Sequence, residues 1–149
     1  MGKVYLDTGK FVEKKKYDSL YVESIFIQVY IDIADLYFKL HTPTAYRLLL
    51  WIMIHMGKHN EIILNKGNRN EFIAYCVQRG GNRVVDGTVK GAMGELVNVG
   101  VIVSTSEPGR RESHYMLNPS YFWSTGKQKD RIESIKAFLH FKEQQNEKN

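Results

Sequence analysis

The segment DGTVKGAMGELVNVGVIV (residues 86–103) combines the pattern of an amphipathic helix with an unusual number of glycines. Four apolar residues follow the i, i+3, i+4, i+7 spacing of a helix with one buried face: Val89, Ala92, Met93 and Leu96. Three glycines lie in the same stretch, Gly87, Gly91 and Gly94. Each glycine inside a helix costs about 1 kcal/mol relative to alanine. We therefore expect a helix over about 86–98 whose outer face comes close to another molecule, or whose glycines let a neighbouring helix or a dimer partner pack tightly.

Length and composition predict a soluble, cytoplasmic protein with its own core. A chain of 149 residues with 43% hydrophobic residues is long enough for one domain. The sequence contains no run of 18 apolar residues, and its first residues lack the apolar stretch of a secretory signal, so we expect no membrane partner. A single cysteine cannot form an internal disulfide, which favours a reducing compartment.

Positive charge is concentrated just before and inside the predicted helix. The whole chain carries a formal net charge of +5. Residues 65–90 hold five cations against two acids: Lys66, Arg69, Arg79, Arg83 and Lys90 against Glu71 and Asp86. Such a distribution suits a polyanionic partner, although many proteins that bind no nucleic acid reach the same net charge.

The first part of the chain predicts a hairpin followed by two helices. KVYLDTGKFVEKKKY (3–17) has two short apolar-alternating runs around a turn at Asp7–Gly9. ESIFIQVYIDIADLYFKL (23–40) alternates like a strand but also fits a helical stripe, and its length favours a helix over about 25–39. HTPTAYRLLLWIMIHMG (41–57) predicts a helix that Thr42 caps, with Pro43 in its first turn and a centre that is apolar nearly all round.

The rest of the chain predicts a short strand, two helices, a hairpin and a final helix. We expect a strand over 61–65, a turn at 66–68, a helix over about 70–78 and a break at 79–82. After the helix over 86–98, strands over 101–105 and 114–119 flank a turn at Pro108-Gly109 and form a β-hairpin. An aromatic cluster at 121–123 and an amphipathic helix over 129–144 complete the chain.

This order of elements predicts an α+β, mainly helical fold, namely a winged helix-turn-helix with an N-terminal β-hairpin and a C-terminal helix. The second helix of the turn motif then enters the major groove of DNA, and the hairpin, or wing, contacts the flanking backbone. We divide the chain into an N-terminal hairpin or arm (1–20), a winged-helix DNA-binding domain (21–125) and a C-terminal amphipathic helix with its tail (126–149).

Several of these motifs resemble segments of known protein families. TVKGAMGELVNVGVI (88–102) resembles the segment from recognition helix to wing in bacterial winged-helix proteins. FIQVYIDIADLYFKL (26–40), YRLLLWIMIHM (46–56) and YMLNPSYF (115–122) resemble the RepL-type plasmid replication proteins, over about residues 20–125. The resemblance implies an initiator that binds double-stranded DNA, recruits host replication proteins and has no nuclease activity. The interval RGGNRVVDG (79–87) is longer than a compact helix-turn-helix usually allows.

Ten residues are candidates for contact with DNA. Gly87 and Gly91 would let the helix backbone approach closely, and Thr88, Lys90, Arg83 and Asn82 would contact bases or the groove. Four further cations would contact phosphates: Lys66, Arg69, Arg110 and Arg111. Each of these polar residues also has an ordinary explanation as a solvated side chain.

Nothing in the sequence predicts an enzyme, a cofactor or a metal. There is no His-x-His pair and no GxxxxGK[ST] loop, and His55 with His59 lack further ligands at suitable spacing. Cys76 lies on an apolar helical face and is interpreted as a buried hydrophobe. Two alternatives remain open: a transcriptional regulator of the same fold, and a protein–protein interaction module or homodimer that uses Tyr121, Phe122, Trp123 and the C-terminal helix.

Overall fold

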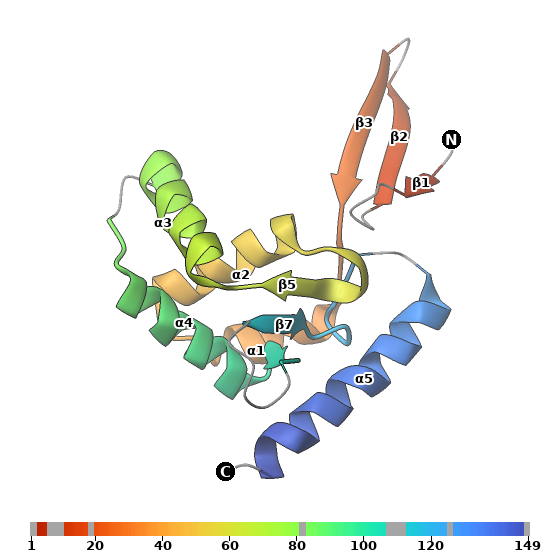
Figure 1. The fold of residues 1–149 in the computed structure, drawn as a ribbon. Helices are drawn as coiled ribbons and strands as arrows, with labels where there is room; N and C mark the ends of the chain where they lie inside the picture. The colour runs from red at the N-terminus through yellow and green to blue at the C-terminus, as the bar shows by residue number, and fades with distance from the viewer. Residues whose placement is uncertain are drawn as a thin grey trace.

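The computed structural model describes residues 3–5, 11–17, 20–80, 83–106, 113–124 and 127–147, with side chains described from Ile27 onwards. The fold is α+β and mainly helical, as predicted. Helices and a small three-stranded sheet form the body, and a separate N-terminal sheet projects from it (Figure 1).

The N-terminal sheet consists of β1 (Lys3–Tyr5), β2 (Phe11–Tyr17) and β3 (Leu20–Phe26), in that order. The pairing of β1 with β2 confirms the predicted hairpin, whose turn lies outside the described residues. The helix predicted over 25–39 is wrong for its first residues, because β3 pairs with β2 up to Phe26 and residues 28–29 form a short strand that pairs with residues 122–123. The β-branched residues here favour this extended backbone. Helical structure is confined to η1 (Ile31–Ile33) and α1 (Ala34–Tyr37).

Helix α2 (Pro43–His55) begins where the sequence predicts. The Thr42 hydroxyl accepts a hydrogen bond from the Ala45 N–H at 3.3 Å, and proline occupies the first turn. Four large residues on its inner side are buried: Leu48, Leu49, Trp51 and Ile52. The apolar centre of α2 is not buried all round, because Leu50 and Ile54 are about half exposed on the opposite side.

Helix α3 (Lys66–Gly80) begins earlier than predicted. It follows η2 (Lys58–Asn60) and β5 (Glu61–Ile63), the short strand expected from the sequence. The expected turn at 66–68 is the first turn of the helix, because the Asn65 side chain accepts a hydrogen bond from the Asn68 N–H at 2.9 Å and so caps it. The helix ends at Gly80, within the predicted break.

Helix α4 (Asp86–Val99) ends at Gly100, which adopts the left-handed conformation at φ 93°. It leads into β6 (Ile102–Ser104), which forms the predicted hairpin with β7 (His114–Leu117). The tip of this hairpin lies outside the described residues. The sheet has the order β5-β7-β6, so that the hairpin adds to the strand that precedes α3.

The core lies between the sheet, α2 and α4. Helix α5 (Gln128–Glu147) packs on the sheet through Phe138, against Val103 and Met116. The alternative of an interface that uses the aromatic residues 121–123 is wrong for Phe122 and Trp123. Both are fully buried in β8 (Phe122–Trp123), which pairs with β4 (Gln28–Val29). None of the helices in the described part of the chain is long and apolar enough to cross a membrane.

Candidate nucleic-acid interface

The side of α4 that faces away from the core carries few side chains, because most of its residues are glycines. At about 3.6 residues per turn, four residues lie on the side opposite to the buried Leu96: Gly87, Gly91, Gly94 and Asn98. We call this stripe the α4 outer face. Lys90 borders it on one side and Thr88 on the other, and both are exposed. The buried residues of α4 are those that the sequence predicted: Val89, Ala92, Met93 and Leu96.

The three glycines have no packing role within the described part of the chain. A Cβ atom added at Gly87, Gly91 or Gly94 has no other heavy atom within 4 Å. Tight packing of helices within the described part of the chain therefore does not explain these glycines.

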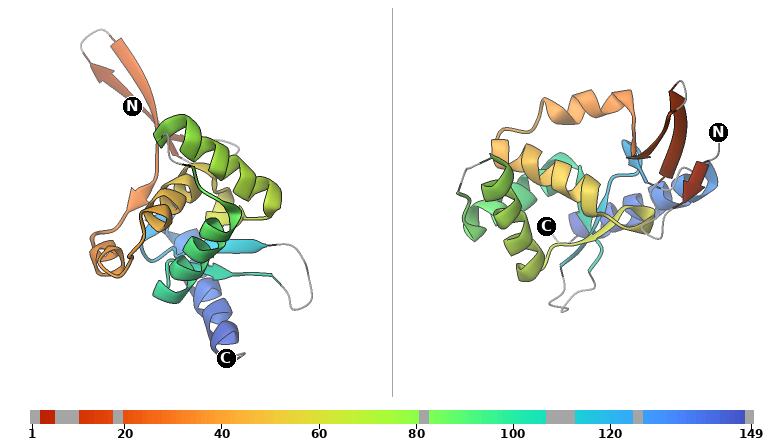
Figure 2. Two further views of the ribbon diagram at one scale, coloured as in Figure 1. Left: turned by 90° about the vertical axis from the view of Figure 1, so that its left-hand side faces the viewer. Right: turned by 90° about the horizontal axis from the view of Figure 1, so that it is seen from above.

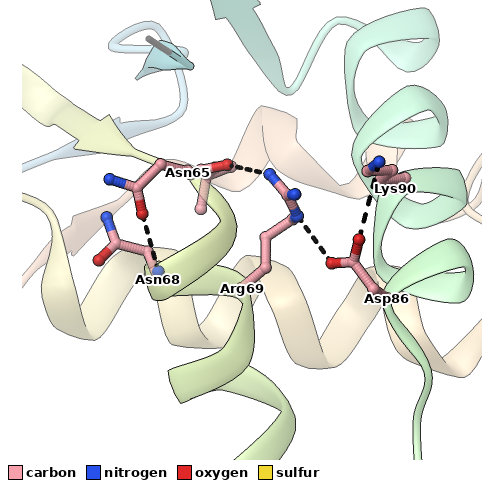
Figure 3. Close-up of polar contacts among 6 residues, drawn as sticks. Asn65, Asn68, Arg69, Asp86 and Lys90 are labelled. Atoms are coloured by element: carbon pink, nitrogen blue, oxygen red, sulfur yellow. Dashed lines mark hydrogen bonds and ion pairs between the residues drawn. The ribbon is translucent and has the colours of Figure 1, made fainter. Parts of the chain in front are cut away.

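Two of the predicted site residues, Arg69 and Lys90, meet around Asp86, between the first turns of α3 and α4 (Figure 3). The Arg69 Nε–H donates a hydrogen bond to Asp86 Oδ1 at 2.8 Å, and Lys90 Nζ lies 3.7 Å from Asp86 Oδ2. The hydrogen bond from Arg69, together with the charges of Arg69, Lys90 and Lys66, lowers the pKa of Asp86. One carboxylate against three cations leaves this corner of the molecule positive.

Arg69 has a different role from the phosphate contact predicted for it. Its side chain is 10% exposed, and its second hydrogen bond goes from Nη1 to the Leu64 carbonyl at 2.9 Å. The guanidinium thus joins the end of β5 and the start of α3 to the start of α4. Removal of one partner from such a buried pair is strongly destabilising. Arg69 is therefore assigned to the fold and not to the proposed contacts.

The other predicted contacts are placed as follows. Lys66 is exposed in the first turn of α3, and Arg83 is exposed three residues before α4. Asn82, Arg110 and Arg111 lie outside the described residues, so their predicted contacts stay predictions.

A groove beside the α4 outer face was not predicted from the sequence. It has a volume of about 440 Å³ and lies between α4, the β6–β7 hairpin and the end of α5. Its polar lining residues are Arg69, Lys90, Asn98, Ser104, Ser113, Tyr115 and Gln145. Burial raises the pKa of Tyr115, one of these lining residues. Helical spacing from Gly91 identifies Asn98 in retrospect, whereas no local pattern identifies Tyr115 or Gln145.

Glu95, one turn after Gly91, contacts the chain itself and does not belong to the α4 outer face. Its carboxylate accepts a hydrogen bond from the Thr42 hydroxyl at 2.6 Å and others from the backbone N–H groups of Thr42 and His41. These bonds lower the pKa of Glu95, with the Thr42 hydroxyl as the largest cause. They fix α4 to the start of α2.

The histidines and the cysteine considered in the sequence analysis lie among contacts that belong to the fold. His55 stacks on Trp51 with ring centroids 4.3 Å apart, and its Nδ1 lies 2.9 Å from the Trp51 carbonyl. The prediction for Cys76 is confirmed: it is buried, and burial raises the pKa of its thiol. A second cavity of about 750 Å³ is lined in part by His55, His59 and His114. Within the described ranges, no three His, Cys, Asp or Glu side chains could together hold a metal ion.

Comparisons of the chain with protein-family models, with curated proteins and with solved structures give no match.

Proposed function

We propose that this protein is a winged helix-turn-helix protein that binds double-stranded DNA through the α4 outer face, and that it initiates replication of a plasmid or a similar mobile element. In this proposal α3 and α4 are the helix-turn-helix, α4 is the recognition helix, and the β6–β7 hairpin is the wing.

The order of the elements supports the winged-helix part of the proposal. Helices and strands follow one another as α2, β5, α3, α4, β6 and β7, and the strand before the turn motif pairs with the second strand of the hairpin. Views from two further directions place α4 and the hairpin on neighbouring parts of the surface (Figure 2). A recognition helix and a wing need this proximity to contact one stretch of duplex.

The observation that carries the proposal is the open, glycine-lined side of α4. With no side chain at Gly87, Gly91 and Gly94, and no other part of the described chain against them, the helix backbone can approach a groove or a phosphate strand closely. Thr88, Lys90 and Arg83 then contact bases or the groove. Lys66 contacts a phosphate from the start of α3, and Arg110 and Arg111 do so from the wing.

The replication role rests on the resemblance to RepL-type proteins. An initiator and a transcriptional regulator of this fold read DNA in the same way, so the interface does not separate them. An array of origin-like repeats beside the gene favours an initiator, which would then recruit host replication proteins to the bound site. The initiator needs no nuclease activity of its own for this role.

Fluorescence anisotropy tests the proposal. Labelled duplexes from around the gene and unrelated duplexes are titrated at several salt concentrations. Binding through phosphates gives a linear fall of log affinity with log salt, with a slope of about −0.9 per neutralised phosphate. Lys90→Ala and Arg83→Ala should change which duplexes are preferred, whereas Lys66→Ala should weaken all of them and flatten the slope by about one.

Lys129→Ala is the matched control, because Lys129 is exposed at the start of α5, away from the start of α4 (Figure 1). Binding that is absent or independent of salt contradicts the proposal, and a partner protein held by apolar contacts would behave in that way. Equal effects of Lys90→Ala and Lys129→Ala contradict the assignment of the interface to α4.

A further inference from the structure

The groove beside the α4 outer face receives uncharged polar side chains from three elements, and we call it the α4 groove. On the hairpin, Ser104 lies opposite Tyr115, so their side chains share one face of the sheet. Ser113, two residues before Tyr115 and still bonded to the neighbouring strand through its carbonyl, lies on that face as well. Asn98 from α4 and Gln145 from the end of α5 line the other sides. Five uncharged side chains that are distant in the sequence therefore meet in one groove.

These five side chains have hydrogen-bonding capacity that the fold does not use. In the part of the chain that the structure describes, none of them forms a side-chain hydrogen bond with another residue. Each hydroxyl carries one donor and each amide carries two. Water satisfies such groups in solution, and a ligand with acceptor atoms can replace that water.

The charge of the α4 groove favours an anion. Two cations, Arg69 and Lys90, belong to its lining, whereas none of the lining residues in the described ranges is Asp or Glu. Asp86, which pairs with both cations, lies outside the lining. The larger cavity of about 750 Å³ differs, because Glu61 and Glu71 are among its lining residues. Donors and cations without a carboxylate suit a ligand with negative charge and several acceptor oxygens, and a phosphate group has both properties.

We propose that the α4 groove binds a phosphate group, which Gln145 and the two hairpin serines hold by hydrogen bonds from uncharged donors. In the proposed function, on which this inference rests for the source of the phosphate, the group belongs to the backbone of the DNA strand beside α4. Gly94 and Asn98 belong both to the α4 outer face and to the groove lining, so a duplex on that face has its backbone at the groove. The end of α5 is then part of the interface. A phosphate ester outside DNA would be held by the same donors.

Anisotropy with labelled duplex tests the donors that lie outside the α4 outer face. Gln145→Ala, and Ser104→Ala with Ser113→Ala, should each weaken binding about three- to tenfold at fixed salt. The slope of log affinity against log salt should stay at the wild-type value, because neither variant removes a cation. Asn146→Ala is the matched control: it removes an exposed amide next to Gln145 that does not line the groove, and it should leave the affinity unchanged. Equal melting temperatures show that the variants are folded.

NMR of the ¹⁵N-labelled full-length protein observes the side-chain amides directly and separates the two sources of phosphate. Duplex DNA should shift the side-chain NH₂ signals of Gln145 and leave those of Asn146 in place. The Gln145→Ala variant identifies the signals, because it lacks them. Inorganic pyrophosphate is the probe for a phosphate outside DNA, and it should shift the same signals. A shift with pyrophosphate and none with bound duplex supports the phosphate site and assigns it to a free phosphate ester.

The failure of this proposal differs from the failure of the proposed function. Duplex binding that depends on salt but is unchanged in the groove variants, with no shift of the Gln145 signals by either probe, would overturn the phosphate site and leave the α4 outer face as the DNA interface. Absence of duplex binding together with a pyrophosphate shift would overturn the proposed function and leave the phosphate site. An equal loss of affinity in Gln145→Ala and Asn146→Ala would contradict the role of the groove.

Discussion

Replacing two glycines of α4 by alanine should stabilise the protein and weaken its binding to DNA. Gly91 and Gly94 lie inside α4, and an added Cβ meets no other heavy atom within 4 Å at either position. The substitutions therefore change the conformational preference of the backbone without a steric penalty in the described part of the chain. The same two methyl groups would lie between α4 and the nucleic acid.

The expected stabilisation follows from helix propensity. Alanine is favoured over glycine by about 1 kcal/mol per position inside a helix, so the double variant should gain about 2 kcal/mol in its free energy of unfolding. For a chain of this length, about 1 kcal/mol shifts Tm by about 2–4 °C, so Tm should rise by about 4–8 °C. Gains in stability with loss of function are common where a site is kept suboptimal for folding.

Thermal unfolding followed by circular dichroism measures the first effect, and anisotropy with labelled duplex measures the second. Gly100→Ala is the matched control of opposite sign, because Gly100 has a positive φ, and the substitution should cost about 1 kcal/mol or more. An unchanged or lower Tm for Gly91→Ala with Gly94→Ala would refute the open environment of α4. A higher Tm with unchanged DNA affinity would refute the use of this face for binding.

Three further outcomes test the surroundings of α4. Arg69→Ala should lower the free energy of unfolding by about 2 kcal/mol, because it leaves Asp86 and the Leu64 carbonyl without their partner. Urea unfolding measures this change. Unchanged stability together with weaker DNA binding would instead support the predicted phosphate contact of Arg69. Folding lowers the pKa of Asp86 and the pKa of Glu95. Both carboxylates therefore stabilise the native state at a pH above their pKa values in the unfolded chain. This stabilisation is lost as the pH falls through their pKa values in the folded protein. Asp86→Asn and Glu95→Gln should therefore each flatten the loss of stability below about pH 4, and an unchanged acid limb would contradict the bonds described. Thr42→Ala should lower stability by about 1 kcal/mol through loss of the α2 cap, and a change within about 0.5 kcal/mol, typical of surface substitutions, would contradict that role.

Patterns that depend on local spacing predicted the structure well. The apolar spacing in 86–98 identified the buried side of α4, and Thr42 marked the start of α2 correctly. The start of α3 was missed because Lys66-Gly67-Asn68 has the composition of a turn, whereas the cap is supplied by Asn65 just before it. Residues close to one another in the sequence determine all of these features.

Features that depend on distant partners were not predictable in the same way. The segment 23–40 fits both a strand and a helix, and its pairing with β2 and β8 decides for strands in its first part. Arg69 is of a residue type that often contacts phosphates, and nothing near it in the sequence indicated its partner. Asp86, seventeen residues later, accepts a hydrogen bond from Arg69 and so keeps its side chain within the fold. The groove brings together residues of α4, the hairpin and α5, so no single window of sequence contains it.

The central claim is that the glycine-lined side of α4 lies against DNA, and a single steric block tests it most directly. Gly91→Leu adds a side chain that points into open space in the free protein. We expect the duplex Kd to rise at least about tenfold at fixed salt, which corresponds to about 1.4 kcal/mol, while Tm stays equal or rises. An unchanged Kd with an intact fold would contradict the claim.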